Sequence, residues 1–238
     1  MDLFTTQAGY EVLLRWLHIA AGITWIGLLY YFNFVQGPFM NAVDADVKGV
    51  ATRMLVPRAL AWFRYSALVT VLAGIIIIIS YLANDFSFAT SRGAILLSGM
   101  LLGVLMLTNV WGVIWRNQQI VIASAEAAAA GGQADPRAAD AGRRAFLASR
   151  TNVLFSIPML FFMIASPHGG FLFGTASFGE KLIYWVIFSV VVLALEANAL
   201  SGLTGASKQY LEKPGSVILS GAVLWAILYG TLIAVWGA

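Results

Sequence analysis

The sequence contains no cysteine, which excludes disulfides, iron–sulfur clusters, thiol nucleophiles and covalently attached c-type haem from these 238 residues. Its two histidines are too few for a three-histidine zinc site. Charged residues make up only 11% of the chain, compared with about 25% in a typical soluble domain. Phosphate-binding loops, dinucleotide fingerprints, zinc-protease helices and carboxylate clusters are also absent from the sequence. The scarcity of charged residues argues against a soluble enzyme, a nucleic-acid-binding module and a disordered tail, and the apolar content described next excludes them.

Apolar residues make up 60% of the chain, compared with about 45–50% in a soluble domain. Crossing a hydrocarbon core of about 30 Å takes about 20 helical residues, because unpaired backbone amides are too costly there for loops. The stretches that meet this requirement are Tyr10–Phe34, Ala59–Ala83, Gly93–Ile122, Phe146–Ser166, Glu180–Leu200 and Gly215–Trp236. The sequence therefore predicts an all-α, polytopic integral membrane helical bundle with about six transmembrane helices, as a single domain over residues 1–238 in the lipid bilayer.

Lysine and arginine are concentrated on one predicted side of the membrane. The loops after the first, third and fifth spans, with the adjacent helix ends, hold 11 of the 14 basic residues. The positive-inside rule places these loops in the cytoplasm, including a loop over about residues 123–145, and both termini in the periplasm. The first span follows a short acidic start without a basic n-region or cleavage site, so we expect a retained anchor rather than a signal peptide.

Proline and glycine mark the expected ends of the spans. These breaks are Gly37-Pro38, Pro57, Asn84-Asp85, Ser166-Pro167, His168-Gly169-Gly170 and Lys213-Pro214-Gly215. Within the long cytoplasmic segment, the alanine-rich Ala123–Ala130 is expected to extend the third helix. Gly131 and Gly132 should end this helix, and Asp135 followed by proline is typical of the start of the next.

His18 lies within the first predicted span, and His168 closes the fourth. On a helix, Gly22 lies one turn below His18 and Trp25 a further turn down the same face, which leaves space beside the histidine for a flat ring system. Arg15, one turn above, could meet an acidic group such as a haem propionate. We therefore consider both histidines as axial ligands of a non-covalent haem b. The alternatives are a hydrogen bond between helices for His18 and an exposed loop position for His168.

The polar residues within the predicted spans include Arg64, Asn109, Asn152 and Glu196. Arg64 and Glu196 are expected at similar depth, so the sequence predicts a buried ion pair, either structural or part of a proton or anion path. For the two asparagines we expect hydrogen bonds between helices.

Several strings together resemble the bacterial membrane-bound urate hydroxylases. They are LHIAAGITWIG (Leu17–Gly27), LAWFRY (Leu60–Tyr65), NVWGVIWRNQ (Asn109–Gln118) and ASRTNVLFSIPML (Ala148–Leu160). The resemblance implies a helical module of the bacterial inner membrane that oxidises urate toward 5-hydroxyisourate and passes the electrons to cytochrome c. The first string also resembles haem-binding protoporphyrinogen oxidases and copper-resistance membrane proteins, in which a first-helix histidine is a ligand.

These observations lead to three hypotheses. The first is an inner-membrane redox protein that binds haem b and passes electrons from a urate-like purine to a cytochrome c. Because these residues contain no haem-attachment cysteines, that cytochrome is expected on a separate polypeptide. The second is a non-catalytic structural or assembly subunit of a larger membrane complex. The third, a small-solute or ion transporter, lacks the internal repeat found in many transporters.

Overall fold

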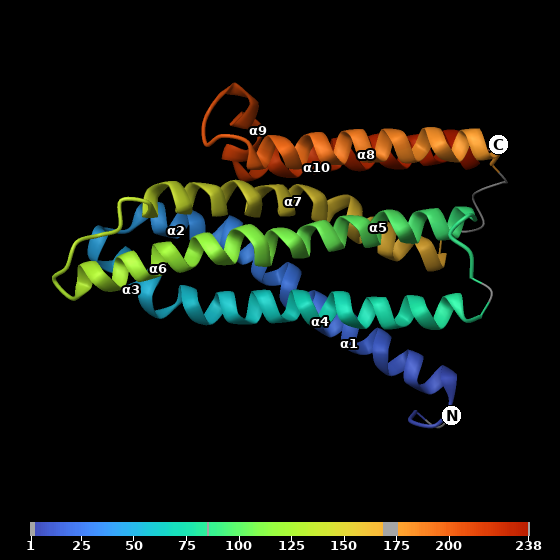
Figure 1. Cartoon of the computed structure of the whole chain (residues 1–238), viewed down its shortest axis with the longest axis horizontal. Coiled ribbons are helices and arrows are strands. Elements are labelled where there is room, and N and C mark those ends of the chain that lie inside the picture. The colour runs from blue at the N-terminus through green and yellow to red at the C-terminus, as the bar shows by residue number, and fades with distance from the viewer. Residues whose placement is uncertain (1–2, 85, 169–175, 238) are drawn as a thin grey trace. The chain divides into compact units, whose positions relative to one another are not determined.

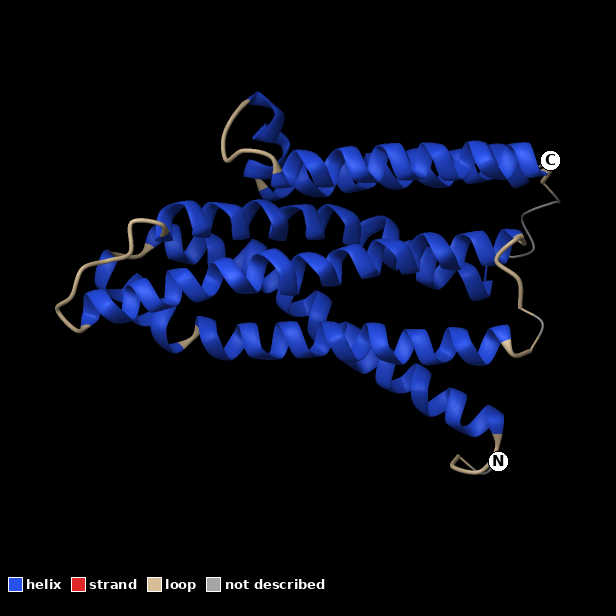
Figure 2. Cartoon of the chain, viewed as in Figure 1, coloured by secondary structure: helices blue, strands red, loops and turns tan. Residues whose placement is uncertain are grey.

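The computed structural model describes residues 3–84, 86–168 and 176–237, and within these ranges every regular element is a helix (Figure 2). Six continuous helical segments are long and apolar enough to cross a membrane. They are Gln7–Ala42, Val56–Leu82, Ser91–Ala129, Ala138–His168, Phe178–Leu200 and Pro214–Trp236. The predicted number and order of spans are confirmed, and the chain is a helical, multi-pass membrane protein.

The chain forms two compact units. Their helices are labelled in Figure 1, where the colour follows residue number. The first unit comprises Met1–Phe86 and Leu107–Phe146, and the second comprises Ser87–Met106 and Leu147–Ala238. The helices of the first unit are α1 (Gln7–Tyr30), η1 (Tyr31–Gln36), α2 (Gly37–Ala42), α3 (Ala45–Met54), α4 (Val56–Leu82), η2 (Asn109–Ile114) and α6 (Trp115–Ala129). The helices of the second are α8 (Phe178–Leu200), η4 (Ala206–Lys208), α9 (Gln209–Glu212) and α10 (Pro214–Trp236). α5 (Ser91–Thr108) and α7 (Ala138–His168) each lie mainly in the second unit.

In the first unit, α1 packs along α4 in the antiparallel direction (Figure 1). The contacts run in opposite order along the two helices, from Glu11 with Ser80, through His18 with Thr70, to Phe32. The Phe32 ring meets the Phe63 ring edge-on at 5.4 Å. This pairing fixes which face of α1 is turned toward α4.

One predicted break, Gly37-Pro38, is wrong, because the helix continues through it. The first span continues past Gly37 and Pro38 to Ala42 by way of the π-helix η1. In this wider turn the Gly37 amide donates to the carbonyl of Phe32, five residues earlier, so the proline ring avoids the clash that an α-helical register imposes. α7 includes Pro167 and ends at His168, within the predicted break, of which Gly169 and Gly170 lie outside the described residues.

The segment between the third and fourth spans follows the prediction more closely. α6 continues to Ala129, and Gly131 then adopts a φ of +81°, which a residue with a side chain rarely takes. The Asp135 carboxylate accepts a hydrogen bond from the backbone N–H of Arg137 at 2.8 Å, just before α7 begins at Ala138. The side chain of Arg137 also donates to this carboxylate, and these hydrogen bonds lower the pKa of Asp135.

In the second unit, α7 and α10 meet closely where α7 contains a proline. Pro158 has no amide hydrogen, so the Leu154 carbonyl lacks its usual helical donor. On α10, a Cβ added to Gly221 would lie 2.8 Å from that carbonyl oxygen and 2.5 Å from Cδ1 of Ile157. Gly221 therefore allows the two backbones to approach each other.

We expect Gly221→Ala to destabilise the protein by about 1–3 kcal/mol, because the added methyl group meets backbone that cannot move aside. The matched control is Gly230→Ala on the same helix, where no atom lies within 4 Å of an added Cβ. Reversible unfolding in mixed micelles measures both changes. Equal stability of the two variants would contradict the close packing of α7 against α10.

Candidate functional site

His18 is held against α4 by a hydrogen bond to the backbone. Its Nδ1 lies 2.8 Å from the carbonyl oxygen of Thr70. Gly74, one turn further along α4, makes room for the ring: an added Cβ there would lie 3.1 Å from Cε1 and 3.2 Å from Nδ1 of His18. The imidazole thus rests on a part of α4 that has no side chain.

This contact determines the tautomer of His18. A carbonyl oxygen only accepts, so Nδ1 carries the hydrogen, and in the neutral ring Nε2 keeps its lone pair. Histidines that bind metals commonly donate their other ring N–H to a backbone carbonyl in this way. His18 therefore has the orientation and protonation expected of a ligand through Nε2.

The two residues predicted below His18 lie on the buried side of α1. An added Cβ on Gly22 would meet Cγ2 of Thr70 at 3.7 Å, an ordinary contact, so Gly22 faces α4. Trp25 is only 2% exposed, and its Nε1 has no hydrogen-bond acceptor among the described residues. A buried indole N–H without an acceptor is a donor that a bound group could satisfy.

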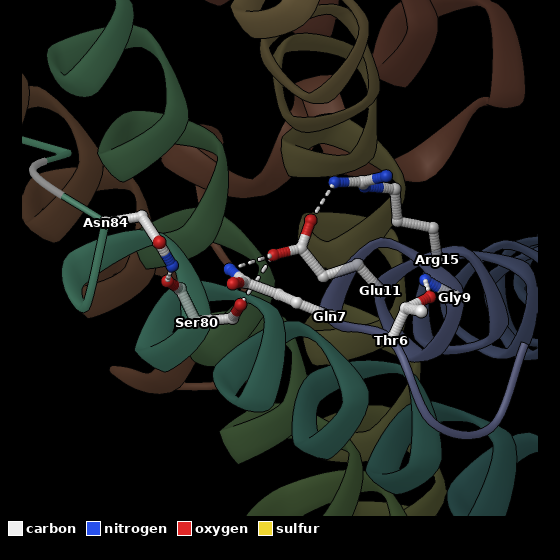
Figure 3. A network of polar contacts seen from close by, with 7 residues as sticks. All are labelled: Thr6, Gln7, Gly9, Glu11, Arg15, Ser80 and Asn84. Carbon is white, nitrogen blue, oxygen red and sulfur yellow. Dashed lines mark hydrogen bonds and ion pairs between the residues drawn. The ribbon is translucent and has the colours of Figure 1, made fainter. Parts of the chain in front are cut away.

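Above His18, a carboxylate joins α1 to the end of α4 (Figure 3). Oε1 of Glu11 accepts from the Ser80 hydroxyl at 2.6 Å and from Nε2 of Gln7 at 3.2 Å. Oε2 accepts from Nη2 of Arg15 at 2.6 Å. The Arg15 guanidinium also lies 5.7 Å from the centre of the Tyr81 ring. The charge of Arg15, predicted to meet a propionate, is thus already compensated by Glu11.

His168 is the exposed last residue of α7, and its Nδ1 donates to the carbonyl of Ile164 in the same helix at 2.9 Å. It belongs to the second unit, whereas His18 belongs to the first. The joint role of the two histidines as axial ligands therefore stays a prediction. Among the described residues, no group of three or more His, Asp or Glu side chains could hold a metal ion.

The other predicted polar residues are divided between the units. Asn152 is fully buried, and its Nδ2 donates to the Met106 carbonyl on α5 at 3.0 Å, which confirms the predicted bond between helices. Asn109 is buried in the π-helix η2. Glu196 is 7% exposed in the second unit and Arg64 lies in the first, so their ion pair stays a prediction.

Sequence reasoning missed the α4 residues that position His18. The carbonyl of Thr70 and the missing side chain of Gly74 have no signature in a sequence, because any helix supplies carbonyls and many contain glycine. The contact of Glu11 with Arg15 was detectable, since opposite charges four residues apart on a helix attract each other. Ser80 was not detectable, because it lies 69 residues from Glu11.

The fold and these contacts define a polytopic helical membrane protein with a positioned histidine between its first two spans. The profile of a known family, urate oxidase N-terminal, matches residues 76–226, which is more than half of the chain. The chain belongs to this family, and the predicted resemblance is confirmed. The match begins within α4, so His18 and Arg64 precede it, while α7 and α8 lie inside it. Searches of curated proteins and of solved structures found no match.

We expect Gly74→Ala to weaken the hydrogen bond between His18 and Thr70, because the added methyl group would lie about one-half ångström too close to the ring. The tautomer can be read by NMR of ¹⁵N-labelled histidine in a His168→Gln background. The original protein should give the Nδ1–H form, and Gly74→Ala should reduce it. Gly27→Ala on α1, with no atom within 4 Å of its Cβ, is the control and should leave the signal unchanged.

A double-mutant cycle tests the contact between Glu11 and Ser80. Glu11→Ala and Ser80→Ala should show a coupling free energy of about 1 kcal/mol, because each variant removes one partner of the same charge-assisted hydrogen bond. Thr24→Ala provides the comparison, since its hydroxyl donates only to the Ala20 carbonyl of its own helix. Additive effects for Glu11 with Ser80 would refute the connection between the two helices.

Proposed function

We propose that this chain is a redox protein that binds haem b, with His18 as one axial ligand through Nε2. The observation that supports this proposal is the contact of His18 with Thr70, which leaves Nε2 as the ligating atom. Bound haem would supply one-electron redox chemistry.

Other residues would bind and orient rather than react. Trp25 would offer its Nε1 hydrogen to an acceptor atom of a bound molecule, since no protein atom in the described part of the chain accepts it. Gly22 has no side chain, so it would leave the surface of α1 beside His18 unobstructed. Arg15 would contribute less to binding an acidic group than a free arginine, because Glu11 shares its charge.

Membership of the urate oxidase N-terminal family supports a urate-like purine as the substrate. The proposed reaction adds the oxygen of one water molecule to urate, giving 5-hydroxyisourate, two protons and two electrons. Two molecules of oxidised cytochrome c would each accept one electron. The proposed location is the bacterial inner membrane, with both termini in the periplasm.

The visible spectrum of the purified protein, reduced minus oxidised, tests haem binding. We expect a haem b band that His18→Ala abolishes, because Nε2 is lost. Gly27→Ala should leave the band unchanged. A protein produced in haem-replete cells that shows no band would overturn the haem proposal.

Substrate and partner are tested separately, by following urate loss together with cytochrome c reduction. The expected ratio is two cytochromes reduced for each urate consumed. A protein with the haem band but without urate-dependent reduction would contradict the substrate alone. Stoichiometric co-purification of partner chains without any cofactor would instead support the role of an assembly subunit.

A further inference from the structure

The Arg64 side chain on α4 is surrounded by aromatic rings. Its guanidinium carbon lies 3.7 Å from the centre of the Trp115 ring, 4.6 Å from that of Tyr65 and 5.3 Å from that of Trp111. Nη2 donates to the Tyr65 hydroxyl at 3.3 Å, and the Trp111 indole N–H donates to the Arg64 carbonyl at 3.1 Å. The rings therefore restrict the position of the guanidinium plane.

This cation has no carboxylate partner among the described residues of its own unit. The ion pairs there are Arg15 with Glu11 and Arg137 with Asp135. Nε of Arg64 is buried without a hydrogen-bond acceptor in the described part of the chain. Aromatic rings attract a cation but do not neutralise it, so the charge of this half-exposed arginine is not balanced by the rings. The Arg64 guanidinium is therefore a candidate to bind an anion.

The surroundings of Arg64 indicate where that anion comes from. Trp62 is 70% exposed and Tyr65 is 51% exposed, both within a turn of Arg64 on α4. Exposed aromatic side chains near the end of a membrane span are typical of the boundary between lipid and water. Arg53 and Arg58 precede this position on α3 and α4, so positive charge accumulates at this end of the first unit.

We propose that Arg64 binds the phosphodiester group of an anionic phospholipid. A planar guanidinium matches two phosphate oxygens, and the exposed ring of Tyr65, which contacts Arg64, would contact the glycerol and the upper acyl chains. Nearby arginines favour a lipid with net negative charge. The proposal uses a different face of α4 from the His18 contact and does not depend on haem binding.

Titration with phosphatidylglycerol in nonionic detergent tests the proposal, with bound lipid counted by native mass spectrometry and the melting temperature measured in parallel. We expect saturable binding that Arg64→Gln abolishes. Arg64→Lys should weaken it about tenfold, because a lysine replaces paired hydrogen bonds by a point charge. The matched control is Arg116→Gln, which removes an exposed cation next to Trp115 and should leave binding unchanged.

Two further measurements identify the counterion. Phosphatidylcholine with the same acyl chains should bind more weakly, and inorganic phosphate should not compete. Equal binding by Arg64→Gln, or full competition by inorganic phosphate, would overturn the lipid site. If Arg64→Gln does not fold, Trp115→Leu should weaken lipid binding by removing the ring beneath the guanidinium.

Discussion

The need to satisfy polar groups without water governs the pairing of α1 with α4. Hydrocarbon offers neither donors nor acceptors, so a histidine within a membrane span must find its partner in the protein. His18 finds the carbonyl of Thr70, and Glu11 finds the hydroxyl of Ser80. Both bonds cross from α1 to α4, and together they set the register and rotation of the two helices. The contact that orients the histidine also leaves the lone pair of the neutral ring on Nε2.

The first unit also contains two π-helical segments, Tyr31–Gln36 and Asn109–Ile114, each with a buried asparagine. Both touch α4 at neighbouring positions, through Phe32 with Phe63 and through Trp111 with the Arg64 carbonyl. Widened helical turns occur frequently at functional sites, because they re-aim side chains without ending the helix. α4 therefore has two regions with distinct contacts. Thr70 contacts His18, and aromatic side chains surround Arg64.

Hydrophobic run length predicted all six spans, because the lipid core imposes a minimum length on any helix that crosses it. Helix ends were less predictable. Pro38 is typical of a break, but the π-helix before it lets the chain continue to Ala42. Likewise, Arg15 was expected to bind an acidic group from outside the chain, whereas Glu11 on the same helix binds it. In both cases a neighbouring turn of the same helix decided the outcome. A π-helical turn accommodates Pro38, and the Glu11 carboxylate pairs with Arg15.

By itself, the sequence determined the class of protein, the number of spans and the family, because these depend on composition, length and residue identity. Tertiary structure decided what His18 touches. The backbone carbonyl of Thr70 and the bare surface of Gly74 become a histidine site only when α1 lies against that face of α4. Carbonyls and missing side chains occur in every helix, so only the packing of one helix on another gives them a chemical role.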